Sequence, residues 1–430
     1  MARTLAELPA GPRLTDYISL GGLARAVPRT TVDEVLRETG KGSQRERELP
    51  AHVMVYYVMA LALYAGTSYG EVLRCLWEGV QWLVGVTQPV AVAGKSAISQ
   101  ARSRLGSEPL RQLYERVVGP IATAQTRGAW YGKWRVVSLD GSTLATTDTP
   151  DNEQAFGRPG ASRGQAAWPL LRFVALVEHG THVLFGADLD AYQVGETTLA
   201  RRVVRSLQRD MLCLADRNFF SFELWQAAQA QGADLLWRIK HNLVLPRLKR
   251  LPDGSYLSQI YPSPQDRRHD RKGVWVRVME YQLEGVEGAE PIYRLVTTLQ
   301  DHQQAPACEL AALYHERWEI EAALDELKTH LRGSQVTLRS KKPDLVKQEF
   351  WGLLLTHFAL RGLMHEAALQ ADEDPDRLSF IHTVRVVRRK LPAFVAAPPR
   401  RRRFGCIRPS WMRFYKSASS PAAGDATHER

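Results

Sequence analysis

The sequence is poor in cysteine and has no long hydrophobic run. Its four cysteines, at positions 75, 213, 308 and 406, show no paired spacing, which excludes a disulfide scaffold and a cysteine-type zinc site. The longest nearly apolar run covers residues 53–65, whereas a membrane-spanning helix needs about 20 residues. Residues 1–12 lack the apolar centre of a signal peptide. We therefore expect a cytoplasmic protein that does not enter a membrane.

Glycine and proline are not enriched, at 31 and 23 of 430 residues, and no internal repeat is visible. Collagen-like and low-complexity architectures are therefore excluded. Hydrophobic residues make up 44% and charged residues 24% of the chain, as in ordinary globular proteins. At about 150 residues per domain, the length allows roughly two to four domains.

Positive charge is concentrated near the carboxyl end. The chain has 57 Lys and Arg against 46 Asp and Glu, a net charge of +11. Residues 328–416 contain 19 basic and 7 acidic residues, so the net charge of this stretch, +12, is larger than the net charge of the whole chain. Such a region is typical of a protein with a polyanionic partner. A solvated, solubilising face is the alternative, and charge alone does not decide between them.

Residues 1–125 are predicted to form a helical, DNA-binding amino-terminal domain. Helices are expected at 31–39, 52–64, 69–83 and 96–105, the third capped by Ser68. The helix at 96–105 is rich in Ser, Gln and Arg, which a recognition helix uses for phosphates and base edges. An ordinary polar surface helix would have the same composition.

The rest of the chain predicts an α/β fold with a mixed sheet. Strands are expected at 135–140, 170–178, 181–188, 211–216 and 235–240, and helices at 196–208, 221–231 and 305–331. This part of the chain is predicted to contain a catalytic core in two parts, at residues 126–242 and 300–370. A β-rich insertion at 243–299 separates the two parts of the core. A basic carboxyl-terminal region with a disordered tail follows at 371–430.

Two aspartates stand where buried strands are predicted to end. Asp140 is the last residue of the strand predicted at 135–140, and Asp216 is the last residue of the strand predicted at 211–216. Open α/β sheets place their ligands at the carboxyl ends of such strands, although a strand-end aspartate is often only a turn former. Two-metal phosphoryl-transfer sites need several converging carboxylates, so a third should come from a neighbouring element.

The helix predicted at 305–331 offers that third carboxylate. At about 100° per residue, four polar residues share one face beside an apolar stripe: Tyr314, Arg317, Glu321 and Lys328. Asp325 points in almost the same direction as Glu321 and is a competing ligand. A salt-bridged surface helix is the alternative, because other acidic residues lie on the same helix.

These residues resemble a known family. The spacing Tyr-x2-Arg-x3-Glu-x6-Lys, from Tyr314 to Lys328, resembles the YREK signature of the DDE transposases in the insertion-sequence-four family. Asp140-Gly-Ser-Thr and Asp216-Arg-Asn-Phe resemble the two aspartate motifs of that family, in the same order. The resemblance covers roughly residues 130–335, and the interval between Asp216 and Glu321 suits the β insertion of the family.

The resemblance implies an RNase H-like catalytic core and two divalent metal ions, normally Mg²⁺ with Mn²⁺ as a substitute. Asp140, Asp216 and Glu321 would be both the catalytic residues and the metal ligands. DNA phosphates would be bound by basic and phenolic side chains of the motifs: Tyr314, Arg317, Lys328 and Arg217. No covalent protein–DNA intermediate is expected.

The implied function is that of a transposase, which cleaves DNA at insertion-sequence ends and joins the 3′-hydroxyl ends to target DNA. An RNase H-like nuclease or resolvase without strand transfer, and a non-catalytic DNA-binding protein, are the alternatives. The expected partners are double-stranded terminal inverted repeats and target DNA, bound by a dimer or larger assembly at the bacterial nucleoid. Excision through a DNA hairpin would favour an aromatic residue that holds an extruded base, and the sequence does not rank Trp237 against Trp275.

Overall fold

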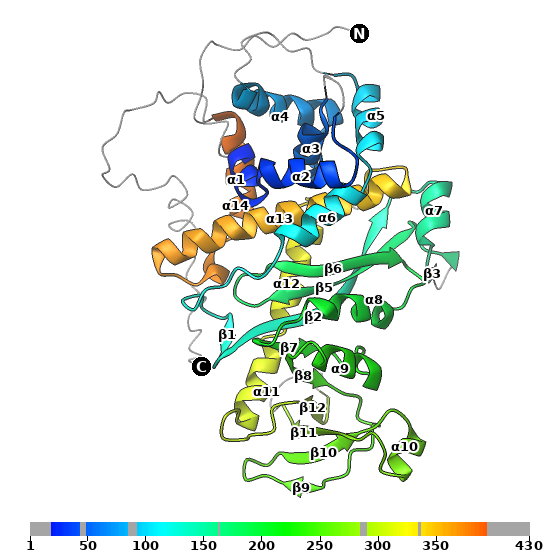
Figure 1. Cartoon of the computed structure of the whole chain (residues 1–430), viewed down its shortest axis with the longest axis vertical. Helices are drawn as coiled ribbons and strands as arrows, with labels where there is room; N and C mark the ends of the chain where they lie inside the picture. Colours follow the sequence, from blue (N-terminus) through cyan, green and yellow to red (C-terminus); the bar gives the residue numbers. More distant parts are fainter. Residues whose placement is uncertain are drawn as a thin grey trace, which may run out of the picture.

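The computed structural model describes residues 19–43, 49–84, 93–161, 164–283, 290–333 and 337–393. A helical region, a central sheet and a β-rich region follow one another along the long axis of the molecule (Figure 1). The basic run at 400–403 and the end predicted to be disordered lie outside the described residues.

The amino-terminal part of the chain is helical, as predicted. Its helices are α1 (Ser19–Ala26), α2 (Arg29–Glu38), α3 (Ala51–Leu63), α4 (Tyr69–Val84), α5 (Lys95–Leu105) and α6 (Glu108–Val117). The backbone N–H of Glu71 donates to Ser68 Oγ at the start of α4, which confirms the predicted cap.

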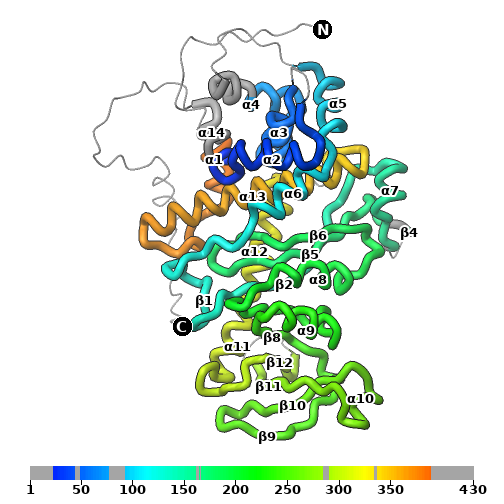
Figure 2. The backbone as a smooth tube through the Cα atoms, viewed as in Figure 1, coloured from blue at the N-terminus to red at the C-terminus, as the bar shows by residue number. Residues whose placement is uncertain are grey.

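Helix α13 (Pro343–Ala371) joins this region to the sheet. It crosses the molecule between helices α1–α5 and strands β5 and β6, with α6 beside it (Figure 2), and it packs along α3. Helix α3 is buried on every side from Val53 to Leu63, because its neighbours come from both ends of the sequence. The chain continues through η3 (Pro375–Arg377) to α14 (Phe380–Ala393).

The central sheet is mixed and runs in the order β6-β5-β2-β7-β8-β12-β11-β10-β9. In the first part β2, β7 and β8 are parallel, whereas β5 and β6 are antiparallel to their neighbours. These strands are β2 (Trp134–Thr146), β5 (Leu170–Glu178), β6 (Leu184–Ala191), β7 (Met211–Ala215) and β8 (Asp234–Arg238). Short strands accompany them: β1 (Trp130–Tyr131) and β13 (Thr337–Leu338) on β2, and a separate pair of β3 (Gly160–Ala161) and β4 (Gly164–Gln165).

The region between β8 and α11 continues the same sheet. Strand β12 pairs antiparallel with β8, and a meander extends the sheet beyond it. Its elements are β9 (Lys249–Arg250), β10 (Tyr256–Ile260), α10 (Pro264–Arg268), β11 (Val274–Tyr281) and β12 (Tyr293–Thr297). The β-rich insertion is therefore tied to the core by backbone hydrogen bonds, and not only by its two connections.

Helices cover both faces of the sheet. Alternate residues of a strand point to opposite faces: Met211 and Cys213 of β7 pack in the core shared with α8 and α9, and Leu212 packs in the core shared with α11. Burial on both sides explains the nearly continuous apolar strands of the sequence. The helices around the sheet are α7 (Pro150–Phe156), α8 (Glu196–Val203), η1 (Val204–Ser206), α9 (Phe222–Gln229) and α11 (Ala307–His315). The predicted α/β class with a mixed sheet is confirmed.

Several predicted elements differ in the structure. The helix expected at 305–331 is divided into α11, α12 (Trp318–Asp325) and the π-helical turn η2 (Glu326–His330). The break arises because Arg317 N bonds to Tyr314 O, three residues back, while Leu331 N bonds to Glu326 O, five residues back. The apolar stripe predicted on this helix is nevertheless buried: Ile320, Leu324, Leu327 and Leu331.

The strand predicted at 181–188 begins later, at Leu184, because the turn after β5 is longer than a two-residue hairpin loop. His182 in this turn has a positive φ of 55°. The described residues include no helix long and apolar enough to cross a membrane.

Candidate active site

The two predicted aspartates lie side by side on adjacent parallel strands. Leu139 of β2 pairs with Ala215 of β7, so Asp140 and Asp216 occupy the next position on each strand. Strand β7 ends there, whereas β2 continues to Thr146 because β5 pairs with it. The expectation that the first strand stops at Asp140 is wrong, but the parallel pairing does end at this point.

Arg317, at the start of α12, connects the acidic residues. Its guanidinium lies 3.6 Å from Asp140 Oδ2 and 3.4 Å from Glu321 Oε1. Although burial lowers the pKa of Arg317, Tyr314 and the three carboxylates of Asp140, Asp216 and Glu321 raise it above the usual value. Two of the three predicted acidic residues, Asp140 and Glu321, therefore contact one guanidinium group, and the charge of the third, Asp216, also acts on it.

Glu321 is better placed than Asp325 to be the third carboxylate. Glu321 contacts the same arginine as Asp140, whereas Asp325 Oδ2 lies 3.0 Å from His330 Nε2. The three carboxylates are not drawn into a tight group, since the compact groups of metal-ligating atoms among the described residues lie elsewhere and are treated below.

Lys328 joins the helix to the first aspartate motif. Its Nζ donates to Ser142 Oγ at 2.9 Å, two residues beyond Asp140 on β2. The side chain is half-buried at this point. A second cation from the signature thus lies beside the strand that carries the first aspartate.

Tyr314 and Arg217 are less available than the sequence suggested. Tyr314 is buried, its hydroxyl makes no hydrogen bond, and the Arg317 guanidinium carbon lies 6.0 Å from its ring centroid. In this conformation Tyr314 supports Arg317 and does not reach solvent. Arg217 ion-pairs with Glu290 at 2.7 Å, so a phosphate would have to displace that carboxylate.

Glu196 is an acidic neighbour that sequence reasoning missed. A Cβ on Gly141 would lie 3.2 Å from the Glu196 side chain, and Glu196 acts on the pKa of Asp140. Its position at the start of α8 made it look like an ordinary first-turn acidic residue. The glycine after Asp140 therefore permits the close approach of a fourth carboxylate.

Helix α5, the candidate recognition helix, is only partly open. Arg102 is buried and donates to Gln348 Oε1 and Ser340 Oγ, both at 2.9 Å. The expectation that the arginines of this helix can contact DNA is therefore wrong for Arg102, because this side chain reaches α13 and the segment before it. The exposed residues of α5 are polar or basic: Lys95, Ser96, Ser99, Gln100, Ser103 and Arg104.

Of the two tryptophans considered for holding an extruded base, Trp237 is fully buried in β8. Trp275 in β11 is 45% exposed. The structure therefore leaves Trp275 as the one of this pair that a base could reach.

Burial raises the pKa of Asp140 to about 6; Glu196 and Asp216 also raise it, while Gly141 N and Arg317 lower it. This value exceeds the value of about 4 in an unfolded chain. The stabilising contribution of the protonated carboxyl is therefore complete below about pH 4 and is lost as the pH rises through the native pKa. The ionised carboxylate destabilises the metal-free fold at neutral pH.

Asp140→Asn is therefore expected to increase the free energy of unfolding by about 1–3 kcal/mol at pH 7.5, and not at pH 4. Urea denaturation in the presence of EDTA, at both pH values, measures this. Asp325→Asn, an exposed change on α12, should stay within about 0.5 kcal/mol of the wild type. If Asp140→Asn instead destabilised the protein at pH 7.5, the ionised carboxylate of Asp140 would not be destabilising the fold as we infer.

Comparison with known proteins identifies the family. Residues 17–115 match the family model described as the insertion element 4 transposase N-terminal, and residues 132–359, more than half of the chain, match the transposase DDE domain. The chain belongs to the DDE transposases of the insertion-sequence-four family. This confirms the resemblance seen in the sequence, and it identifies an enzyme that acts on DNA and uses divalent metal.

Two curated relatives of this transposase come from Escherichia coli (strain K12). "Transposase InsG for insertion sequence element IS4" is 29% identical over 376 residues, which is 86% of this chain and 82% of that protein. "Putative transposase InsZ" is 27% identical over 222 residues, 50% of this chain and 69% of that protein. Among solved structures, the piggyBac transposase synaptic complex with hairpin DNA aligns over 92% of this chain and 84% of that chain, with a TM-score of 0.47 and 10% identity.

Proposed function

We propose that this transposase cleaves the DNA strand at insertion-sequence ends and joins the 3′-hydroxyl ends to target DNA, with Asp140, Asp216 and Glu321 as the catalytic residues. The observation that carries the proposal is that Arg317 contacts both Asp140 and Glu321, while Asp216 follows the strand paired beside Asp140, so that carboxylates from three separate segments of the chain come near one guanidinium. Such a concentration of negative charge is suited to cationic ligands such as divalent metal ions.

The donor set fits divalent cations of the magnesium class. Asp140, Asp216 and Glu321 offer only carboxylate oxygens, which are the ligands that Mg²⁺ and Mn²⁺ prefer. When bound, two such ions would supply activation of the attacking water or 3′-hydroxyl and stabilisation of the leaving oxygen. We propose that two ions bind at this site and that they are Mg²⁺, with Mn²⁺ as a substitute.

The cations of the signature would hold the DNA strand. Arg317 would exchange its ion pairs with Asp140 and Glu321 for a phosphate, which a guanidinium binds through two parallel hydrogen bonds. Lys328, beside Ser142, would contribute a point charge to a neighbouring phosphate. Tyr314 would hold the Arg317 guanidinium from the buried side. The exposed face of α5 is the proposed reading surface for duplex DNA, and a dimer or larger assembly would synapse two ends.

The presence of a joined product tests the proposal against a nuclease without strand transfer. The wild-type protein, Mg²⁺, a duplex bearing the terminal inverted repeat and a supercoiled target plasmid should give cleaved ends and strand-transfer product. The terminal inverted repeat used in the duplex is the one that flanks the coding sequence of this transposase. Cleavage without any joined product, even when pre-cleaved 3′-hydroxyl ends are supplied, would favour the resolvase alternative.

Lys328→Ala is expected to weaken binding to the transposon end while metal binding stays intact. Loss of a charged contact to phosphate costs roughly 1.5–3 kcal/mol, so cleavage should fall about 10- to 150-fold at subsaturating DNA. Arg317→Lys should not restore full activity, because an ammonium group cannot reproduce the two-pronged contact. Calorimetric titration with Mn²⁺, together with end-binding and cleavage assays, measures both effects.

Lys347→Ala is the charge-matched control, since Lys347 is exposed on another helix, α13. It should leave end binding and cleavage at subsaturating DNA within a few-fold of the wild type. Loss of Mn²⁺ binding in Lys328→Ala with normal affinity for DNA would show that Lys328 supports the carboxylates and not the DNA.

A further inference from the structure

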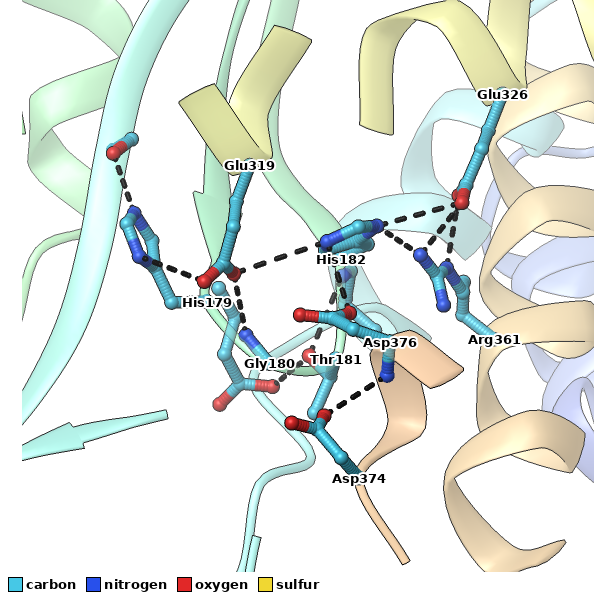
Figure 3. Close-up of polar contacts among 12 residues, drawn as sticks. His179, Gly180, Thr181, His182, Glu319, Glu326, Arg361, Asp374 and Asp376 are labelled. Atoms are coloured by element: carbon cyan, nitrogen blue, oxygen red, sulfur yellow. Dashed lines mark hydrogen bonds and ion pairs between the residues drawn. The ribbon is translucent and has the colours of Figure 1, made fainter. Parts of the chain in front are cut away.

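A second group of ionisable side chains lies beside α12, the helix that carries Glu321. It combines the turn between β5 and β6, the inner face of α12 and the segment around η3 (Figure 3). Ligand atoms of His182, Glu319 and Asp376 lie within 4.8 Å of one another. Glu319 precedes Glu321 by two residues, but it points toward this turn, where Gly180 N donates to its Oε2 at 2.7 Å.

The His182 ring is held from one side and open on the other. Its Nδ1 lies 3.4 Å from Glu326 Oε1 and also contacts Arg361. Its Nε2 makes no hydrogen bond, although it lies 3.1 Å from Asp376 Oδ1 and 3.8 Å from Glu319 Oε2. The side chain is more than nine-tenths buried. The Arg361 guanidinium can only donate, so Nδ1 accepts from it in one tautomer, whereas in the other tautomer Nδ1 donates to Glu326 Oε1. In the second tautomer, which a metal ion would select, the Nε2 lone pair faces the two carboxylates, as in histidine ligands whose outer nitrogen binds a carboxylate.

A second buried histidine has the same arrangement toward Glu319. His179 Nε2 lies 2.6 Å from Ser138 Oγ, and its Nδ1 makes no hydrogen bond and lies 3.6 Å from Glu319 Oε1. The two histidines thus turn their free nitrogens toward the two oxygens of one glutamate.

Glu319 and Asp376 have only histidines as ion-pair partners among the described residues. Arg361 binds Glu326 through two hydrogen bonds of 2.9 and 2.7 Å, so these two charges cancel and the arginine is taken. The carboxylates of Glu319 and Asp376 would repel each other when both are ionised, and a single divalent ion between them would neutralise both.

We propose that His182 Nε2, Glu319 and Asp376 bind one divalent transition-metal ion, with Zn²⁺ the best match, at a site separate from the catalytic carboxylates. Zn–N and Zn–O bonds of about 2.0–2.1 Å place tetrahedral ligand atoms roughly 3.3–3.5 Å apart, between the two separations measured from His182 Nε2. An imidazole ligand favours Zn²⁺ over Mg²⁺. The ion would fasten α12 to the β5–β6 turn and to η3, and it stands independently of the proposed cleavage chemistry.

A neighbouring group, His179, Glu316 and Glu319, shares Glu319. Glu316 is exposed, so an ion there would meet water more than protein. The His182 group takes its three ligands from three separate segments of the chain and has a carboxylate behind its histidine. It is therefore the group we assign.

The test uses the full-length protein, stripped with EDTA and then titrated with Zn²⁺ or Co²⁺. We expect one tightly bound Zn²⁺ per chain by elemental analysis, tetrahedral visible bands with Co²⁺, and a melting temperature raised on the order of 3 °C at 100 times Kd. The triple variant Asp140→Asn, Asp216→Asn, Glu321→Gln should retain all three signals. A wild type that binds no Zn²⁺, or loss of the signals in the triple variant, overturns the proposal.

Matched variants locate the ion. His182→Gln and Asp376→Asn should each abolish the Co²⁺ bands and the melting shift; Asp376→Asn keeps shape and size, which guards against misfolding. Asp372→Asn, in the same segment with a fully exposed side chain, should change nothing. If Glu316→Gln abolishes binding while Asp376→Asn retains it, the ion belongs to the neighbouring group and the assignment is wrong.

Discussion

Asp140→Asn, Asp216→Asn and Glu321→Gln are each expected to reduce strand cleavage at least about 100- to 1000-fold while end binding stays within a few-fold of the wild type. A metal ion at a phosphoryl-transfer site supplies several kcal/mol of transition-state stabilisation, and about 1.4 kcal/mol corresponds to a factor of ten. The amide keeps the size of each side chain but is a weaker ligand without charge. Binding survives because the cations that would hold phosphates remain.

Cleavage of a labelled transposon end, measured beside an electrophoretic binding assay, provides the result. Asp325→Asn is the matched control on α12, because Asp325 faces His330 and not Arg317. A variant of the three with near wild-type cleavage would remove that residue from the site. An inactive Asp325→Asn together with an active Glu321→Gln would move the third carboxylate to Asp325.

Arg102→Ala is expected to destabilise the protein by about 3–5 kcal/mol, because removing one partner of a buried ionic network leaves the other unpaired. Arg102 donates to Gln348 and Ser340, and its guanidinium lies 3.8 Å from Glu349. Glu349 is itself buried. The loss should appear in urea denaturation of the full chain and should be the same with and without DNA.

Arg104 on the same helix provides the comparison. Its side chain is exposed, so Arg104→Ala should change the free energy of unfolding by no more than about 0.5 kcal/mol. If α5 reads DNA, Arg104→Ala should weaken end binding and reduce its salt dependence by about one phosphate contact. Equal stability of the two variants would contradict the buried network of Arg102.

The order of the main strands from β2 to β8, the helices between them and the three acidic motifs could be predicted from the sequence because each depends on local patterns. The strand at β7, for example, is an apolar run that ends in Asp216, and the position of Glu321 follows from fixed spacing. Helix α13, by contrast, was not predicted. The break at Arg317 could not be predicted, because an ideal helical wheel assumes unbroken hydrogen bonding between residues four apart. Only the packed structure shows that the chain leaves this pattern on both sides of α12.

The burial of individual polar residues could not be predicted from the sequence either. Arg102 and Tyr314 have polar neighbours in the sequence, and α13 or the sheet covers them only after distant segments come together. The group around His182 had no signal at all, since its ligands lie at positions 182, 319 and 376 with no regular spacing. Their meeting depends on the tertiary fold, whereas the signature residues lie close together along the chain.

The pairing of β12 with β8 fixes where the β-rich region stands relative to the two aspartates. Adjacent strands lie about 4.8 Å apart, and β11 lies three strands from β7 in the sheet, so the strand that carries Trp275 stands roughly 14 Å from the strand that ends beside Asp216. Backbone hydrogen bonds between neighbouring strands hold this spacing. A change in the length of the loops that connect this region to the rest of the chain should therefore leave the spacing between Trp275 and the aspartates unchanged.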